Sequence, residues 1–171
     1  MALEVKRTPK MVYVEVSLLW RRAGGAAAIF RPGTREIYDV RMPTAAPGRA
    51  GIYRISIDLI AGRAVYIGEG ASISHRLYQY TRVYKGKKST TETRMSRRIR
   101  KALAEGKAVS VDTATTGKID LAGSERPLEM ENVAERRFAE AAAVLAEAEQ
   151  DIDGKIIVLN RILDEDWWLS D

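Results

Sequence analysis

The sequence is most informative at Gly51-Ile52-Tyr53, which is followed after twelve intervening residues by Tyr66-Ile67-Gly68. Residues 51–56 and 64–68 are rich in β-branched and aromatic side chains and predict two strands. Ala61-Gly62-Arg63 lies between them and predicts the turn of an antiparallel hairpin. Such a hairpin places Tyr53 and Tyr66 close together at one of its ends.

A short helix is expected directly after this hairpin, from about Ser72 to Tyr80, with Ser72 or Ser74 as its N-cap. Arg76 and Tyr80 are four residues apart and therefore lie on one face of that helix. The glycines of the hairpin allow the backbone to pack closely around the tyrosines. The residues thus predict a pocket in which two phenols, a guanidinium group and a third phenol converge. An ordinary cross-strand aromatic pair is the alternative.

The first 50 residues predict further strands. Three are expected, over about 11–20, 27–30 and 35–42, with Gly24-Gly25 and Pro32-Gly33 as the breaks between them. We assign residues 1–50 to a β-rich N-terminal extension and residues 51–171 to the core of the same domain. The length of 171 residues is typical of a single domain.

A second helix is expected over residues 91–105. Met95, Ile99 and Leu103 recur at helical spacing along one face, the arginines occupy the other faces, and Gly106 ends the helix. Val109, Val111 and Thr113 then alternate as a strand.

A long helix is expected near the C-terminus. Residues 117–127 are expected to be a loop, residues 128–150 the helix, and residues 155–160 a last short strand. The expected buried stripe of the helix consists of Val133, Phe138, Ala141 and Leu145. The order of elements predicts an α+β fold, with a small central antiparallel or mixed sheet flanked by helices.

The composition limits the chemistry that this chain can perform. It has no cysteine and a single histidine, His75, which excludes disulfides, thiolate nucleophiles and Cys-ligated zinc. A catalytic metal would therefore be a hard ion held by carboxylate and water, Mg²⁺ or Mn²⁺. No apolar run reaches the roughly 20 residues that span a bilayer. Residues 1–10 lack the apolar stretch of a signal peptide, so a cytoplasmic protein without membrane contact is expected.

The net charge of +5 is unevenly distributed along the chain. Between Arg82 and Lys101 there are nine basic residues and one acid, Glu92, whereas residues 125–151 contain eight acids and three arginines. Such a bipolar molecule can turn one face toward a polyanion. Solvated helix faces are the ordinary explanation of such runs, and the asymmetry alone favours nucleic acid only weakly.

The two tripeptides together with Arg76 and Tyr80 resemble the GIY-YIG nuclease family, over residues 51 to about 160. The resemblance implies a divalent-metal-dependent DNA endonuclease that leaves a 5′-phosphate and a 3′-hydroxyl. It implies that Tyr53 is the general base or orients the attacking water, and that Tyr66 belongs to the nucleophile and phosphate network. Arg76 would stabilise charge on the phosphoryl group, and Tyr80 occupies a position held by His or Tyr. The hairpin spacing is slightly longer than the commonest one, which predicts an enlarged turn at residues 61–63.

The resemblance also implies a metal-binding glutamate on the last long helix. Glu140 is the preferred ligand for Mg²⁺ or Mn²⁺, because an arginine-bearing helical run precedes it and small and aliphatic residues follow. Glu147 is the rival, because it lies thirteen residues before Asn160, nearer to the usual family spacing. Asn160 resembles the asparagine that supports the site in family members.

The basic run follows the expected catalytic helix and is expected to flank the scissile phosphate of duplex DNA. Its expected DNA contacts are Arg82, Lys85, Lys87, Lys88, Arg94, Arg97, Arg98 and Lys101. The chain is most similar to restriction-type family members, which implies a sequence-specific enzyme that acts as a homodimer on palindromic sites. Three alternatives stay open: a non-catalytic DNA-binding protein, a repair or mobile-element nuclease, and an RNA-directed nuclease.

Overall fold

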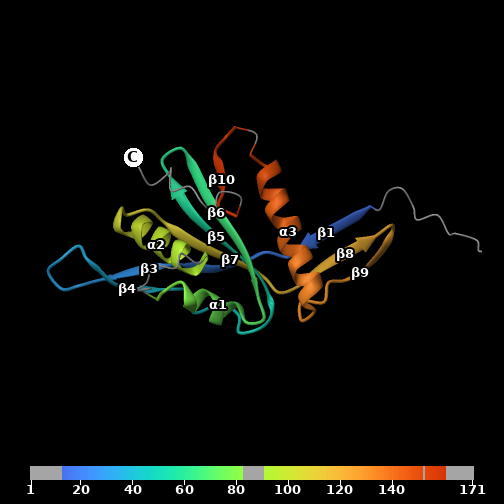
Figure 1. Ribbon diagram of the computed structural model, residues 1–171, viewed down its shortest axis with the longest axis horizontal. Helices are drawn as coiled ribbons and strands as arrows, with labels where there is room; N and C mark the ends of the chain where they lie inside the picture. The colour runs from blue at the N-terminus through green and yellow to red at the C-terminus, as the bar shows by residue number, and fades with distance from the viewer. Residues whose placement is uncertain (1–12, 83–90, 152, 161–171) are drawn as a thin grey trace, which may run out of the picture.

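The computed structural model describes residues 13–82, 91–151 and 153–160, and these residues have an α+β architecture (Figure 1). The strands are β1 (Val14–Leu18), β2 (Arg21–Gly25), β3 (Ala27–Phe30), β4 (Ile37–Arg41), β5 (Gly51–Leu59), β6 (Gly62–Gly70), β7 (Val109–Ala114), β8 (Gly117–Leu121), β9 (Ser124–Pro127) and β10 (Ile156–Val158). The helices are α1 (Ile73–Gln79), α2 (Thr91–Ala104) and α3 (Val133–Glu149). The predicted α+β class is confirmed. No helix within these ranges is long and apolar enough to cross a bilayer.

A central sheet of five strands has the order β10-β6-β5-β7-β2. β10 is parallel to β6 and the other pairs are antiparallel, so the sheet is mixed. Successive residues of a strand point to opposite faces of the sheet. On β5, Tyr53 and Ile55 belong to the core formed with α1 and α2, whereas Ile52 belongs to the core that α3 covers with Ala139 and Ala143. The sheet thus separates α1 and α2 from α3.

The N-terminal extension is part of this fold. β2 forms one edge of the central sheet beside β7, and β1 pairs with β8 in a second sheet that β9 completes. β3 and β4 form a separate two-stranded ribbon. Figure 1 shows this ribbon and the second sheet at opposite ends of an elongated molecule. The extension therefore completes the sheet that positions the two tripeptides.

The β5–β6 hairpin has longer strands and a tighter turn than predicted. Leu59 pairs with Gly62, which leaves only Ile60 and Ala61 in the loop. Gly62 has a φ of +145°, which glycine adopts without strain. The predicted enlarged turn is therefore wrong, because the extra residues lengthen both strands to nine residues.

The first two helices lie where they were predicted. The Ser72 hydroxyl caps α1 by accepting from the N–H of His75 at 3.4 Å. On α2, Met95 and Ile99 are fully buried, and Gly106 ends the helix with a φ of +74°. Ala102 is buried where Leu103 was expected, and Leu103 is only partly covered.

The segment before α3 differs from the prediction. Residues 117–127 are not a loop but the β8–β9 hairpin, whose turn residues Ala122 and Gly123 both have positive φ. α3 begins at Val133 rather than near residue 128, because Asn132 caps it by accepting from the N–H groups of Ala134 and Glu135. The residues in between pack against the core under α3 instead of extending the helix.

The predicted buried stripe of α3 is wrong. Val133, Phe138 and Leu145 are 49%, 42% and 54% exposed, and Ala141 is exposed as well. The residues that α3 buries are Arg136, Ala139, Ala143 and Glu147. A buried charge is costly unless it is paired. Both charges are paired, since Arg136 binds Glu69 from β6 and Glu147 binds two arginines of the hairpin.

Candidate active site

Three tyrosine side chains meet on the face of the central sheet that α1 and α2 cover. In the hairpin register Tyr53 is opposite Gly68 and Tyr66 is opposite Ile55, so the two tyrosines are diagonal neighbours. Their ring centroids are 6.3 Å apart, and the Tyr80 ring is 6.2 Å from each. The Tyr53 and Tyr80 hydroxyl oxygens are 2.6 Å apart and form a hydrogen bond. The sequence-predicted tyrosines thus come together.

Burial keeps these phenols protonated. Tyr53 and Tyr80 are fully buried and Tyr66 is 6% exposed. Burial raises the pKa of the Tyr53 hydroxyl above its ordinary value, and the nearby Arg76 charge offsets only part of the rise. Burial also raises the pKa values of Tyr66 and Tyr80. At neutral pH the three hydroxyls are therefore uncharged hydrogen-bonding groups.

Gly68 makes room for the Tyr53 ring. A Cβ atom at position 68 would lie 2.2 Å from the Tyr53 hydroxyl oxygen and 2.4 Å from Cζ of the same ring. Gly51 is equally constrained, because a Cβ there would lie 2.5 Å from the carbonyl oxygen of Ala114. Both outer glycines of the tripeptides therefore have a packing reason to be glycine.

We expect Gly68→Ala to destabilise the protein by about 1–3 kcal/mol, the usual cost of forcing extra volume into a packed core. The displaced group would be the Tyr53 hydroxyl, so the variant should also lose its candidate activity. Thermal unfolding measures the first effect. Gly48→Ala is the matched control, since a Cβ there meets Ser74 Oγ at an ordinary 3.6 Å. Equal unfolding temperatures for Gly68→Ala and Gly48→Ala would contradict the close packing of the Tyr53 ring against residue 68.

Arg76 lies beside the tyrosines and is held by neighbouring side chains. Its Cζ is 5.9 Å from the centre of the Tyr80 ring. Nη1 donates to Gln79 Oε1 at 2.7 Å and forms an ion pair with Glu92 at 2.6 Å. The side chain remains 31% exposed, so it is partly accessible from the surface. Glu92 is a site neighbour that the sequence interpretation did not include; its place as the only acid in the basic run is the signal that could have indicated it.

Asn160 holds the second tripeptide in place. Its Oδ1 accepts from the Ile67 N–H at 2.9 Å, and its Nδ2 donates to the Ile67 carbonyl at 2.6 Å. The Leu159 N–H donates to the Val65 carbonyl at 2.8 Å, so the side chain of Asn160 continues the pairing of β10 with β6. Asn160 therefore fixes the backbone at Ile67, after Tyr66, while Leu159 fixes it at Val65, before Tyr66; Asn160 does not itself join the tyrosine cluster.

The substitution Asn160→Asp removes one of these two hydrogen bonds and keeps the other. The introduced carboxylate can still accept from the Ile67 N–H but cannot donate to the Ile67 carbonyl, so we expect a loss of about 1–3 kcal/mol at neutral pH. Protonation restores a donor, and the difference from the wild type should shrink as the pH falls. Urea unfolding at neutral and at acidic pH measures both effects. If Asn160→Asp is as stable as the wild type at neutral pH, the amide donor of Asn160 contributes nothing to the free energy of unfolding.

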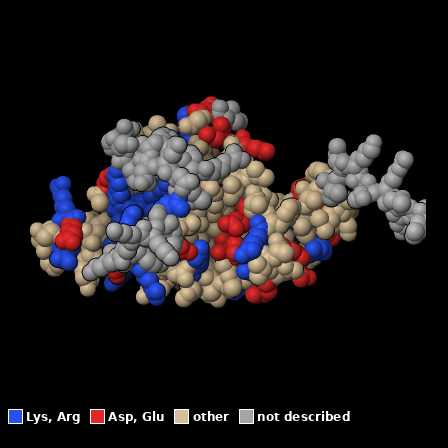
Figure 2. All heavy atoms as spheres, viewed as in Figure 1, with Lys and Arg blue, Asp and Glu red and all other residues tan. Residues whose placement is uncertain are grey.

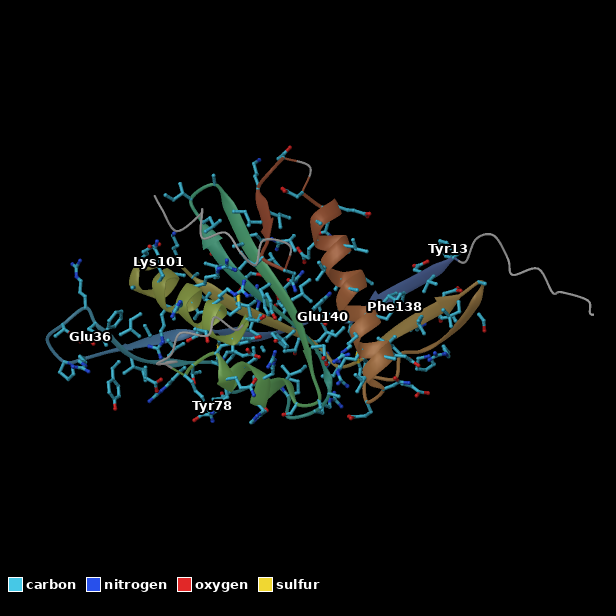
Figure 3. All side chains as sticks on the ribbon, viewed as in Figure 1. Tyr13, Glu36, Tyr78, Lys101, Phe138 and Glu140 are labelled. Carbon is cyan, nitrogen blue, oxygen red and sulfur yellow. The ribbon has the colours of Figure 1, made fainter. Side chains whose placement is uncertain are left out.

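Glu140 lies on the side of α3 that faces β6 (Figure 3). Burial raises the pKa of this half-buried carboxyl group, and the charge of Glu69 raises it further. Glu69 is itself fixed by Arg136, whose Nε donates to it. The charge of Glu140 in turn raises the pKa of Tyr66, so this residue links α3 electrostatically to the tyrosine cluster.

The Glu140 carboxyl group offers oxygen ligands of the kind that a hard cation prefers. Within the described ranges, no three acidic or histidine side chains gather into a ready-made metal cage. Mg²⁺ commonly keeps several waters and binds through only one or two carboxylates. A half-buried carboxylate that is repelled by a second one gains most from a nearby divalent charge. Glu140 is thus a half-buried carboxylate of the kind that hard ions prefer as a ligand, whereas Glu69 is already paired with Arg136.

Glu147 has different surroundings from Glu140. It accepts from Nη1 of Arg54 and, at 2.9 Å, from Nη2 of Arg63. Arg54 also donates to Asp112 at 3.0 Å. Because Arg54 follows Tyr53 on β5, it points to the opposite face of the sheet. Glu147 thus belongs to an ion-pair network on the α3 face, away from the tyrosines.

The basic run is only partly exposed. Figure 2 shows Lys and Arg side chains gathered over α2 and acidic side chains near the middle of the molecule, beside α3. Arg97 is exposed, and Arg82 is exposed with its Cζ 5.2 Å from the centre of the Tyr78 ring. Arg94 and Lys101 are partly exposed. Arg98 is only 1% exposed, so its prediction as a DNA contact is wrong, because a buried guanidinium group cannot reach a phosphate.

Three further predicted DNA contacts, Lys85, Lys87 and Lys88, lie outside the described residues. Arg82, Arg94, Arg97 and Lys101 therefore form the described basic surface at α2.

No protein-family model matches this chain, and no curated protein or solved structure shows significant similarity to it.

Proposed function

We propose that this protein is a divalent-metal-dependent endonuclease that hydrolyses phosphodiester bonds in duplex DNA, as the GIY-YIG resemblance implies. The observation that carries the proposal is the convergence of Tyr53, Tyr66 and Tyr80 with Arg76 beside them. A packed core needs aliphatic and aromatic volume, but it does not need three phenol groups with a partly exposed arginine beside them. The described basic surface on α2 supports a polyanionic substrate.

Arg76 has the position and charge to stabilise a phosphoryl group. Negative charge builds on the nonbridging and leaving oxygens during hydrolysis, and preorganised donors aimed at that charge lower the barrier. Glu92 and Gln79 hold the guanidinium group, which limits the reorganisation needed when a phosphate arrives.

Tyr53 is fully buried, so within this proposal its hydroxyl supports the site as a hydrogen-bonding group and does not act as a free phenolate. Its pKa is raised by burial, so the hydroxyl keeps its proton at neutral pH. Its hydrogen bond with Tyr80 fixes the direction of the hydroxyl group. Tyr66, the least buried of the three phenols, is then the member nearest to solvent, and the charge of Glu140 raises its pKa.

Glu140 is the residue that we propose as metal ligand. A bound Mg²⁺ or Mn²⁺ supplies Lewis-acid stabilisation of the charge on the phosphoryl oxygens. Both oxygens of Glu147 already accept from arginines, and this favours Glu140 over its rival.

Incubation of long duplex DNA with the protein tests the proposal, in Mg²⁺ and beside an EDTA control. Discrete fragments that disappear in EDTA are expected if the enzyme is sequence-specific and of restriction type. A smear of fragments would support nuclease activity but would exclude a sequence-specific enzyme of restriction type. Preferential cleavage of RNA would identify an RNA-directed enzyme, and tight DNA binding without any cleavage would identify a non-catalytic binding protein.

The restriction-type proposal includes a homodimer, because one site cuts one strand and a palindrome has two-fold symmetry. Sedimentation of the protein with and without cleavable DNA tests this part separately. A monomer under both conditions would contradict it.

A further inference from the structure

A positively charged pocket lies outside the tyrosine site. It has a volume of about 220 Å³ and opens between β2, the end of β7 and the segment before β5. Its polar lining consists of Arg21, Arg22, Arg49, Thr113, Thr115 and Thr116. Hydroxyl and guanidinium groups together are typical of a site for an anion with several oxygens, such as a phosphate.

Two of the three arginines of this pocket, Arg21 and Arg49, are not neutralised by an acid among the described residues. Arg22 forms an ion pair with Asp112 at 2.9 Å. In the described part of the chain, Arg21 and Arg49 have no acidic partner, and Nη2 of Arg49 donates to Thr115 Oγ1 at 2.8 Å. The Thr113 side chain is nearly buried, at 6% exposure, and its hydroxyl has no hydrogen-bond partner among the described residues. The pocket thus presents unpaired positive charge and an unused hydroxyl group.

The register of the sheet places this pocket next to the candidate active site. Arg21 is opposite Thr113 on β7, and Thr113 is opposite Tyr53 on β5, so the three side chains lie on one face. Two strand spacings separate Arg21 from Tyr53, which is roughly 10 Å. The backbone carbonyls of Pro47 and Arg49 also accept from the first N–H groups of the Arg76-bearing helix α1. The same short segment therefore borders both sites.

We propose that this pocket binds a non-scissile backbone phosphate of the DNA whose scissile phosphate lies at the tyrosine site. The proposal rests on the proposed function. A backbone separation of roughly 10 Å keeps the pocket and the tyrosine site close enough for one strand of DNA to contact both. The N-terminal extension thereby supplies substrate contacts that the core alone lacks, through Arg21 of β2 and Arg49.

The test is a salt titration of binding to a short fluorescent duplex in EDTA, where cleavage is suppressed. For Arg21→Ala/Arg49→Ala the slope of log affinity against log salt should become shallower by about 0.9, the change expected when one phosphate contact is lost. Affinity at moderate salt should fall about 10- to 100-fold. Lys118→Ala/Lys155→Ala is the matched control, because it removes the same formal charge from two exposed lysines on β8 and before β10. Its slope should remain close to that of the wild type.

Arg21→Glu is a second variant that leaves the Arg49–Thr115 hydrogen bond intact, and it should weaken binding at least as much. A wild-type slope in both arginine variants, or an equal change in the lysine control, would overturn the proposal.

Single-turnover cleavage at saturating protein separates this result from the proposed function. If the enzyme is a nuclease, the arginine variants should cleave at the wild-type rate once bound, because neither arginine touches the tyrosine cluster. If the salt dependence of binding changes in the arginine variants but the wild type cleaves no DNA, the phosphate pocket is supported and the proposed nuclease function is rejected. If the wild type cleaves DNA and the salt dependence is the same in the arginine variants, the nuclease function is supported and the phosphate pocket is rejected.

Discussion

Arg76→Ala is expected to lower the rate of DNA cleavage by about 10³-fold at saturating protein, the scale lost when one preorganised donor to a developing charge is removed. The Cζ of its guanidinium group is 5.9 Å from the centre of the Tyr80 ring, which places a positive charge beside the tyrosine cluster. Single-turnover kinetics on a labelled duplex measure the effect without interference from product release.

Arg76→Lys and Arg97→Ala are the controls for this prediction. Lysine keeps the charge but not the planar donors, so Arg76→Lys should recover only part of the rate. Arg97→Ala removes an exposed guanidinium group from α2 and should weaken binding while the rate at saturation stays unchanged. Cleavage by Arg76→Ala within about threefold of the wild type would exclude Arg76 from transition-state stabilisation.

Glu140→Gln and Glu147→Gln are expected to change different properties of the protein. Glu140 has a raised pKa in the folded state, so the folded state binds its proton more tightly than the unfolded state does. The stability that it contributes is full at acidic pH and is lost as the pH rises through the folded pKa. At neutral pH the ionised carboxylate is therefore a cost, and Glu140→Gln should raise the unfolding temperature while it abolishes metal-dependent cleavage.

Glu147→Gln should lower the unfolding temperature, while the folded protein keeps its metal-dependent cleavage. It removes the negative partner of Arg54 and Arg63 from a site that is 4% exposed, and breaking a buried ion pair costs about 3–5 kcal/mol. For a chain of this size such a loss lowers the unfolding temperature by roughly 2–4 °C for each kcal/mol. Thermal unfolding over a pH series, beside cleavage assays of the folded fraction, measures both variants. A stable but inactive Glu147→Gln together with an active Glu140→Gln would reverse our assignment of the metal ligand.

The hairpin and the first two helices could be predicted because local signals agree there. The β-branched and aromatic residues of β5 and β6 have no helical spacing, and Ser72 and Gly106 mark helix ends by their own conformational preferences. The meeting of Tyr53 with Tyr66 then follows from strand alternation, without any long-range information.

The buried face of α3 could not be predicted in the same way. In an Ala-rich helix several faces are almost equally apolar, and the buried one is selected by partners that are distant in the sequence. Glu69 allows Arg136 to be buried, and Arg54 with Arg63 does the same for Glu147. The β8–β9 hairpin escaped prediction because Ala122 adopts a φ of +54°, a conformation that usually indicates Asn, Asp or Gly in a turn.

The most direct test of the central claim compares the wild type with Tyr53→Phe on an end-labelled duplex in Mg²⁺. Phenylalanine fills the same buried space and removes only the hydroxyl group that hydrogen-bonds to Tyr80. The proposed site predicts wild-type products with a 5′-phosphate and a 3′-hydroxyl, no products in EDTA, and a loss of at least about 10²-fold in Tyr53→Phe. Cleavage that persists in Tyr53→Phe at the wild-type rate, or no cleavage by the wild type, would contradict the assignment of this tyrosine cluster as a phosphodiesterase site.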